Sequence, residues 1–204
     1  MNTLRRILVL APFALAFLGG YTAQAQQLSL EEISSYLNGL QTAQAEFTQV
    51  NADGTISTGS ITIKRPGRIR FDYNAPDNSL VLAGGGQLSI FDPRSNSNPE
   101  QYPLNRTPLS IILDRNVNLS REQMVVGHRS GGATTTITAQ DPEHPEYGTI
   151  QLVFTANPVE LRQWIITDNT GSQTTMILGD LTKGGSYSEN LFSAVVAAEK
   201  WPLK

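Results

Sequence analysis

The chain has 204 residues, and its 15 lysines and arginines against 18 aspartates and glutamates give a net charge of −3 at pH 7. This acidic balance argues against nucleic-acid binding, which needs a basic surface. It also gives no reason to expect binding to an anionic membrane. Cysteine is absent, which excludes disulfides, a thiolate nucleophile and a cysteine-based metal site.

The first residues match the pattern of an export signal. Two arginines precede an apolar run, residues 7–18, that is too short for a permanent membrane anchor, and Ala23-Gln24-Ala25 supplies the small residues that a signal peptidase accepts. We expect residues 1–25 to be cleaved, leaving one domain, residues 26–204, whose net charge is −5 because two arginines are lost. Gln26 stands where a lipoprotein has its modified cysteine, so we expect no lipid anchor.

An amphipathic helix is predicted at the start of this domain. Ser29 and Glu32 have the spacing of a capping box, and Asn38-Gly39 would end or loosen the helix. Four apolar residues then share one helical face: Ile33, Tyr36, Leu37 and Leu40.

Strands dominate the rest of the chain. Apolar and polar residues alternate over residues 59–64 and 68–73, and Arg65-Pro66-Gly67 between them is a turn signal, so this pair predicts a hairpin. Shorter strands are predicted at residues 79–83, 87–91, 124–128, 134–139, 149–155, 160–167 and 173–178. Short polar turns between successive strands favour a mainly β fold, an antiparallel meander that curls into a barrel or half-barrel.

One segment departs from the strand pattern. Thr107 is a typical N-cap residue and Pro108 suits a first helical position, so a short helix is predicted over residues 107–114. Its apolar face is formed by Leu109, Ile112 and Leu113. We expect this helix to pack across the open concave face of the sheet as a plug or lid.

The alternating strands offer an apolar face with eight candidate residues: Ile61, Ile63, Ile69, Phe71, Leu80, Leu82, Leu88 and Ile90. Such a face usually forms a filled core. The alternative is a concave apolar surface under small helices that opens to receive a lipid chain. In that case each buried methylene group would contribute about 0.8 kcal/mol to binding.

The sequence offers little for catalysis. It has no G-x-S-x-G motif, and Gly84-Gly85-Gly86 has the context of neither a dinucleotide-binding loop nor a P-loop. His128 and His144 are the only histidines, and the acidic loop 141–146 suits a turn better than a ligand cage. We therefore expect no enzymatic activity, no cofactor and no bound metal ion.

Several short motifs follow one another in a set order between Leu30 and Leu113. The longest is the stretch from Ile61 to Tyr73. The shorter ones are Ala45-Glu46-Phe47-Thr48-Gln49 before it and Leu80-Val81-Leu82-Ala83, Phe91-Asp92-Pro93 and Thr107-Pro108-Leu109 after it. Together they resemble the LolA family, the periplasmic carriers of outer-membrane lipoproteins. Residues 125–178 match only in strand rhythm.

This resemblance implies a strongly curved antiparallel sheet, an incomplete β-barrel closed by short lid helices. It implies a periplasmic chaperone that takes acylated lipoproteins from an inner-membrane ABC transporter of the LolCDE type and holds their acyl chains in an apolar cavity. Delivery is to the outer membrane, to a LolB-type receptor if one is present. We expect a monomer, because a carrier needs its mouth free.

The resemblance also implies roles for single residues. Arg65 matches the arginine of the family's Lys-Arg-Pro motif, which hydrogen-bonds the lid backbone and stabilises the closed state; a surface charge at a hairpin turn is the alternative. Ile69 and Phe71 match positions that face the cavity. The lid helix is matched by Leu109, Ile112 and Leu113.

Three points stay open at this level. Trp164 is flanked by Ile165 and Ile166, so alternation does not decide which face it occupies. Residues 194–198 could form a short helix or a last strand. A binding module of the same fold for another lipid or glycolipid, or a sensor of lipoprotein and envelope stress, is the alternative function.

Overall fold

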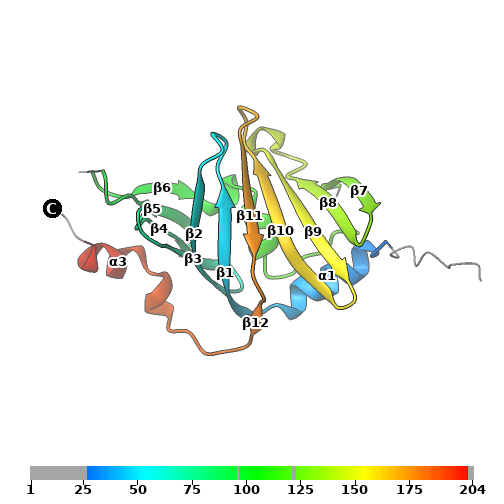
Figure 1. Ribbon diagram of the computed structural model, residues 1–204, viewed down its shortest axis with the longest axis horizontal. Helices are drawn as coiled ribbons and strands as arrows, with labels where there is room; N and C mark the ends of the chain where they lie inside the picture. Colours follow the sequence, from blue (N-terminus) through cyan, green and yellow to red (C-terminus); the bar gives the residue numbers. More distant parts are fainter. Residues whose placement is uncertain (1–26, 96, 121–122, 202–204) are drawn as a thin grey trace, which may run out of the picture.

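A single curved antiparallel sheet forms most of the molecule (Figure 1). The computed structural model describes residues 27–201 apart from 96 and 121–122, so the expected leader, residues 1–25, lies outside the described residues. Within them the strands are β1 (Thr42–Val50), β2 (Ile56–Lys64), β3 (Arg68–Tyr73), β4 (Leu80–Gly84), β5 (Gln87–Phe91), β6 (Glu100–Pro103), β7 (Val125–Gly131), β8 (Thr134–Gln140), β9 (Thr149–Ala156), β10 (Val159–Thr167), β11 (Gln173–Leu178) and β12 (Thr182–Lys183).

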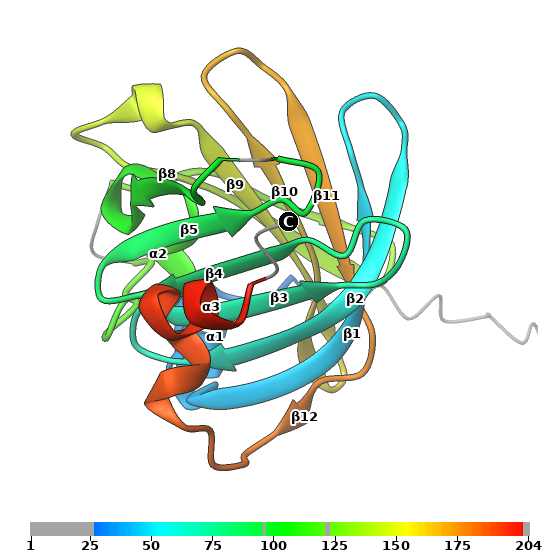
Figure 2. The ribbon, with the colours of Figure 1, turned by 90° about the vertical axis from the view of Figure 1, so that its left-hand side faces the viewer.

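The sheet consists of two meanders joined side by side. Its strand order is β6-β5-β4-β3-β2-β1-β11-β10-β9-β8-β7, and β12 pairs with β1 off this path. The pairing of β1 with β11, in which Phe47 lies opposite Leu178, joins the first half of the chain to the second. The end strands β6 and β7 do not close the path, so the predicted incomplete β-barrel is confirmed (Figures 1 and 2).

The predicted hairpin after residue 59 is present as β2 and β3. Ile61 pairs with Phe71 and Ile63 with Ile69, so alternation places all four side chains on one face. Gly67 provides the positive φ of +70° that the intervening turn requires. Strands β1, β6 and β12 were not predicted, and β7 continues three residues beyond His128.

Three α-helices and three short 3-10 helices are found in the described residues. They are α1 (Leu30–Gly39), α2 (Leu109–Leu113), α3 (Ala194–Lys200), η1 (Leu104–Arg106), η2 (Pro145–Tyr147) and η3 (Glu189–Phe192). The predicted capping box of α1 is confirmed: the Ser29 hydroxyl accepts the Glu32 N–H at 3.1 Å, and the Glu32 carboxylate accepts the Ser29 N–H at 2.8 Å. The segment 194–198 is helical, which resolves the choice between helix and strand.

The helix expected over residues 107–114 is shorter, and its predicted cap is wrong. Pro108 occupies the N-cap position of α2, and the Thr107 hydroxyl donates to the Leu104 carbonyl at 2.8 Å instead of accepting from the helix. Among the described residues, no side chain accepts a hydrogen bond from the first turn of α2.

The helices cover the two faces of the sheet unequally. A large apolar cluster on the concave side joins α1, α2 and the loop after α2 to residues of β1–β4 and β8–β11. A small cluster on the convex side packs α3 against β4 and β5 (Figure 2). No helix in the described part of the chain is long and apolar enough to cross a bilayer.

Candidate functional site

The concave face of the sheet is lined by buried apolar side chains. Ile61, Ile63, Ile69 and Phe71 are each no more than 4% exposed and belong to the large cluster. The register continues this face across the next strands: Phe71 lies opposite Val81, which lies opposite Ile90, and Ile69 lies opposite Ala83, which lies opposite Leu88. Leu88 and Ile90 are half-buried on this face. Six of the eight predicted residues therefore share one surface.

Leu80 and Leu82 do not belong to this surface, and that part of the prediction is wrong. Their side chains lie on the convex face in the small cluster with Phe91 and Ala197. The residues that β4 contributes to the interior are Val81 and Ala83. Because all four of these β4 residues are apolar, alternation in the sequence could not decide which pair faces inward.

Aromatic rings meet in the middle of the interior. Trp164 on β10 is 2% exposed, and its ring is edge-on to Phe71 with 6.3 Å between centroids. Phe47 on β1 makes similar contacts with Phe71 at 5.8 Å and with Tyr73 at 5.1 Å. Trp164 therefore faces inward, and edge-to-face contacts connect the two halves of the sheet across the interior.

The helix α2 fills the concave side. Leu109, Ile112 and Leu113 are 6%, 4% and 2% exposed and belong to the same cluster as Ile69 and Phe71. The loop that follows α2 adds Val117 and Leu119 to that cluster. The predicted apolar face of this helix is thus buried in the interior.

Arg65 connects the two helices on the concave side. Its guanidinium donates to the Leu37 carbonyl in the last turn of α1 through Nη1 and to the Asp114 carbonyl, directly after α2, through Nη2. Nη2 also lies 3.4 Å from the Asn38 side-chain oxygen. Helix C-termini leave carbonyls without partners and carry partial negative charge, so one cation satisfies both helix ends.

Arg65 is unusual because it is 6% exposed. Burial lowers the pKa of its guanidinium, and the Asp114 carboxylate acts in the opposite direction. Its Nε has no partner among the described residues. Charged donors to carbonyls are worth about 1.5–3 kcal/mol each, so the buried guanidinium depends on its two helix-end acceptors.

Two further polar side chains tie the loop after α2 to α1, and neither was predicted. The Asn38 amide donates to the Val117 carbonyl at 2.8 Å and accepts the Val117 N–H at 2.9 Å. The Ser34 hydroxyl accepts the Leu119 N–H at 3.0 Å. Asn38 was interpreted only as a helix-ending residue, and nothing in its local sequence points to a partner 79 residues away.

One end of the interior adjoins a pocket of about 790 Å³. Tyr73, Val81 and Ile90 line it from the concave face, and the β1–β2 hairpin contributes Ile56, whose side chain is 67% exposed. Its rim carries charged groups: Asp53, Asp77, Asp92 and Arg94. In the described ranges, no three His, Asp or Glu side chains gather closely enough to hold a metal ion.

The family model of the outer membrane lipoprotein carrier protein LolA matches residues 38–195, most of the chain. The chain belongs to the LolA family. This membership confirms the resemblance that the motifs between Leu30 and Leu113 indicated, and it extends the match to the second half of the sheet.

Two outer-membrane lipoprotein carrier proteins with similar sequences agree with this membership. An outer-membrane lipoprotein carrier protein of Chromohalobacter salexigens is 25% identical over 182 residues, covering 84% of this chain and 85% of its own. One from Pseudomonas aeruginosa is 24% identical over 199 residues, covering 93% of this chain and 94% of its own. A solved LolA superfamily protein from Nitrosomonas europaea, 9% identical with a TM-score of 0.43, covers 81% of this chain and 98% of that one.

Membership in the LolA family gives the coarse role of the chain. The family consists of periplasmic carriers of outer-membrane lipoproteins, and a carrier needs no catalytic residues. The apolar interior, the buried helix α2 and the Arg65 contacts are the features of this LolA family member from which its mechanism can be argued.

Proposed function

We propose that the protein binds the acyl chains of lipoproteins in the interior between the curved sheet and the helices α1 and α2. It would receive them from an inner-membrane ABC transporter of the LolCDE type and deliver them to the outer membrane, to a LolB-type receptor where one is present. The single observation that carries this proposal is the apolar interior beneath the apolar face of α2. It is lined by Ile61, Ile63, Ile69 and Phe71.

Acyl chains and α2 would compete for the same apolar surface on the concave face of the sheet. Burying Leu109, Ile112 and Leu113 is worth about 1.5–3 kcal/mol each and burying a methylene group about 0.8 kcal/mol, so roughly six to eleven methylene groups offset the exposure of all three side chains. An acyl chain can thus displace the helix, and the helix can later displace the acyl chain, without a chemical step. A ligand shifts such an equilibrium only by its differential affinity for the two states.

In the proposed mechanism, Arg65 shifts the equilibrium between the closed state, with α2 in the interior, and the open state. Its bonds to the Leu37 and Asp114 carbonyls join α1 and α2 in the closed state. Opening would give up these bonds, which favours release of cargo once an acceptor is available. Asn38 and Ser34 support the same state through the loop that follows α2.

The proposed route requires export and a free mature chain. In this account residues 1–25 are a cleaved signal and residues 26–204 form one carrier domain, active as a monomer. N-terminal sequencing of the protein recovered from the periplasm tests the cleavage, and light scattering tests the monomer.

A release assay with energised spheroplasts tests the function. Mature protein is added, and the soluble fraction is analysed by mass spectrometry for triacylated lipoproteins bound to it. We expect stoichiometric release that stops when ATP is depleted. Ile69→Glu is expected to abolish release, whereas Leu82→Glu, at a comparably buried position on the other face, retains it.

The same assay can also reject the proposed function. If folded wild-type protein releases no lipoprotein while other lipids co-purify with it, the lipoprotein carrier is rejected. A binding module for another lipid or glycolipid, or an envelope sensor, then takes its place.

A further inference from the structure

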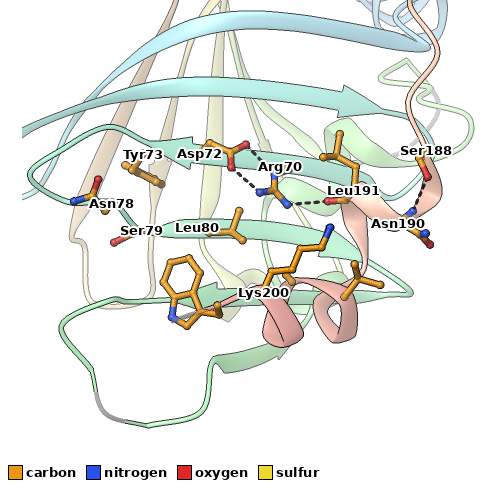
Figure 3. A pocket seen from close by; sticks show the side chains of 13 residues that line it. Arg70, Asp72, Tyr73, Asn78, Ser79, Leu80, Ser188, Asn190, Leu191 and Lys200 are labelled. Atoms are coloured by element: carbon orange, nitrogen blue, oxygen red, sulfur yellow. Dashed lines mark hydrogen bonds and ion pairs between the residues drawn. The ribbon is translucent and has the colours of Figure 1, made fainter. Parts of the chain in front are cut away.

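A second pocket, of about 510 Å³, lies on the convex face of the sheet (Figure 3). The strands β3 and β4 form its floor, and the C-terminal segment of η3 and α3 forms its cover. Arg70 and Leu80 line this outer pocket, whereas Ile69 and Phe71 beside Arg70 in the chain belong to the interior cluster. The strands β3 and β4 therefore lie between most of the outer pocket and the interior, and among the described residues the outer pocket shares only Tyr73 and Ser79 with the pocket of about 790 Å³.

The outer pocket exists because the cover touches the sheet at two places and leaves space between them. At Gly84 a Cβ atom would lie 2.0 Å from the Phe192 carbonyl oxygen, so the segment lies directly on the sheet there. At the other end Trp201 packs on Phe91 with 5.3 Å between ring centroids. Between these contacts α3 turns the small side chain of Ala197 toward the sheet. The space is within the about 300–1,000 Å³ typical of small-molecule sites.

Its walls are amphipathic. Leu80, Val196 and Trp201 supply apolar surface. Arg70 is fixed at the polar side: Nε and Nη2 donate to the two Asp72 carboxylate oxygens at 2.8 and 2.7 Å, and Nη1 donates to the Leu191 carbonyl at 3.0 Å (Figure 3). These bonds use three of its five N–H groups, so two remain for a ligand.

The charge of this lining favours an anion. Lys200 lines the same pocket as Arg70 and Asp72, which gives two cations against one carboxylate. Within the described part of the chain the ion pairs of this region join Arg70 to Asp72 and leave Lys200 without a carboxylate. A ligand carboxylate would thus meet one positioned guanidinium and one flexible ammonium group.

We propose that the outer pocket binds a fatty acid, a single-chain anionic amphiphile, with its hydrocarbon tail against Leu80, Val196 and Trp201 and its carboxylate at Arg70 and Lys200. This site goes beyond lipoprotein carriage and is separate from the interior. Each methylene group buried there raises the affinity about fourfold. Occupancy would also brace the C-terminal segment against the sheet.

The two tryptophans of the chain report on the two sites independently. Trp164 lies in the interior and Trp201 lines the outer pocket. A fatty acid with a nitroxide on its chain quenches a tryptophan that it contacts. Trp164→Phe leaves Trp201 as the only reporter, and Trp201→Phe leaves Trp164; circular dichroism checks that both variants are folded.

In the Trp164→Phe protein we expect saturable quenching of Trp201 by the labelled fatty acid. Adding Lys200→Glu should weaken this binding about fivefold or more at low ionic strength, because even exposed ion pairs contribute up to about fivefold and the change reverses the charge. Lys200 is exposed, so this substitution leaves folding intact. Adding Ile69→Glu, which disables the interior in the proposed function, should leave Trp201 quenching unchanged.

Three results would overturn the proposal. The first is quenching of Trp164 without quenching of Trp201. The second is equal binding of the labelled methyl ester, which lacks the charge. The third is equal binding by Lys200→Glu. None of them would reject lipoprotein release, and the first would support acyl binding in the interior, so this proposal and the carrier function can fail separately.

Discussion

The concave and convex faces of the sheet are covered by helices that are held in different ways. On the concave face, α1 and α2 bury a large apolar cluster and are joined by the buried Arg65. On the convex face, the C-terminal segment buries a small cluster and is held by exposed charges: Glu189 pairs with Lys64 at 2.7 Å and with Arg68.

The basic residues at the β2–β3 turn contact the helices on both faces of the sheet. Lys64 and Arg68 flank the β2–β3 turn and point to the convex side, whereas Arg65 within the turn reaches the helix ends on the concave side. A buried guanidinium bonded to carbonyls is poorly screened by salt, and an exposed ion pair is well screened. We therefore expect α2 to leave the concave face when a ligand competes for its site. We expect the C-terminal segment of η3 and α3 to loosen from the convex face at low pH or high salt.

The largest effect is expected from a charge placed on the concave face. Phe71→Glu should abolish acyl binding and lower the free energy of unfolding by about 3–5 kcal/mol, because an unpaired carboxylate replaces a central ring. Phe91→Glu is the matched control, since Phe91 is equally buried on the convex face. It should lose comparable stability and keep acyl binding, measured with a fluorescent fatty-acyl probe at a temperature where circular dichroism shows both variants folded. Equal loss of binding in both would remove the distinction between the faces.

A smaller effect is expected from the loss of the Arg65 contacts. Arg65→Leu should lower the free energy of unfolding by about 1.5–3 kcal/mol, because its two bonds to the Leu37 and Asp114 carbonyls disappear while the cost of burying its charge, which offsets part of their contribution, disappears as well. Hydrogen exchange should speed up in α2 and in the loop that follows it, and delivery to the outer membrane should suffer more than capture of cargo.

The matched control is Arg68→Leu, three residues away, which removes an exposed pair with Glu189 and touches neither helix on the concave side. Its exchange rates in α2 should stay at the wild-type level. Arg65→Lys should behave like Arg65→Leu, since a single ammonium group cannot reach both helix ends in the same fork geometry. Wild-type delivery by Arg65→Leu would reject the gating role.

The smallest effect is expected at Glu189. Hydrogen bonds from Lys64 and Arg68 lower the pKa of its carboxyl below 4.5. A lowered folded-state pKa contributes stability that is present above the unfolded pKa and is lost as pH falls through the folded value. The C-terminal segment should therefore loosen as pH falls below about 4.5.

Iodide quenching of Trp201 in the Trp164→Phe protein measures that loosening. Glu189→Gln should show the loosened state at neutral pH and lose this part of the pH dependence. Glu199→Gln on the exposed side of α3 serves as the control and should behave like the parent protein. If both substitutions leave the pH profile unchanged, the ion pairs do not hold the convex cover.

Local pattern was enough to predict much of this fold. The capping box at Ser29, the alternation on both sides of Arg65-Pro66-Gly67 and the apolar face of α2 depend on neighbours in the chain, and all are present. The incomplete barrel followed from strand rhythm and from the resemblance to the LolA family. The face that Trp164 occupies could be decided only from the structure, because its flanking isoleucines give no alternation of apolar and polar residues.

Most of the errors share one physical origin, the dependence on partners distant in sequence; the cap expected at Thr107 is the exception, because Thr107 contacts Leu104 nearby. Leu80 and Leu82 were assigned inward because β4 is apolar on both faces, and the side is decided by the pairing of β4 with β3 and the packing of α3. The edge strand β6 and the two-residue β12 exist through pairing with β5 and β1 rather than through their own pattern. The partners of Asn38 and Ser34 lie in a loop about 80 residues away.

The most direct test of the central claim is to find where the acyl chains of bound cargo lie. A lipoprotein whose acyl chains carry a diazirine is released onto the wild-type protein and irradiated, and the adducts are mapped by peptide mass spectrometry. We predict adducts in peptides containing Phe71, Trp164 and Leu113, on the concave face beneath α2. Adducts confined to Leu80 and Trp201, on the convex face, would contradict this account.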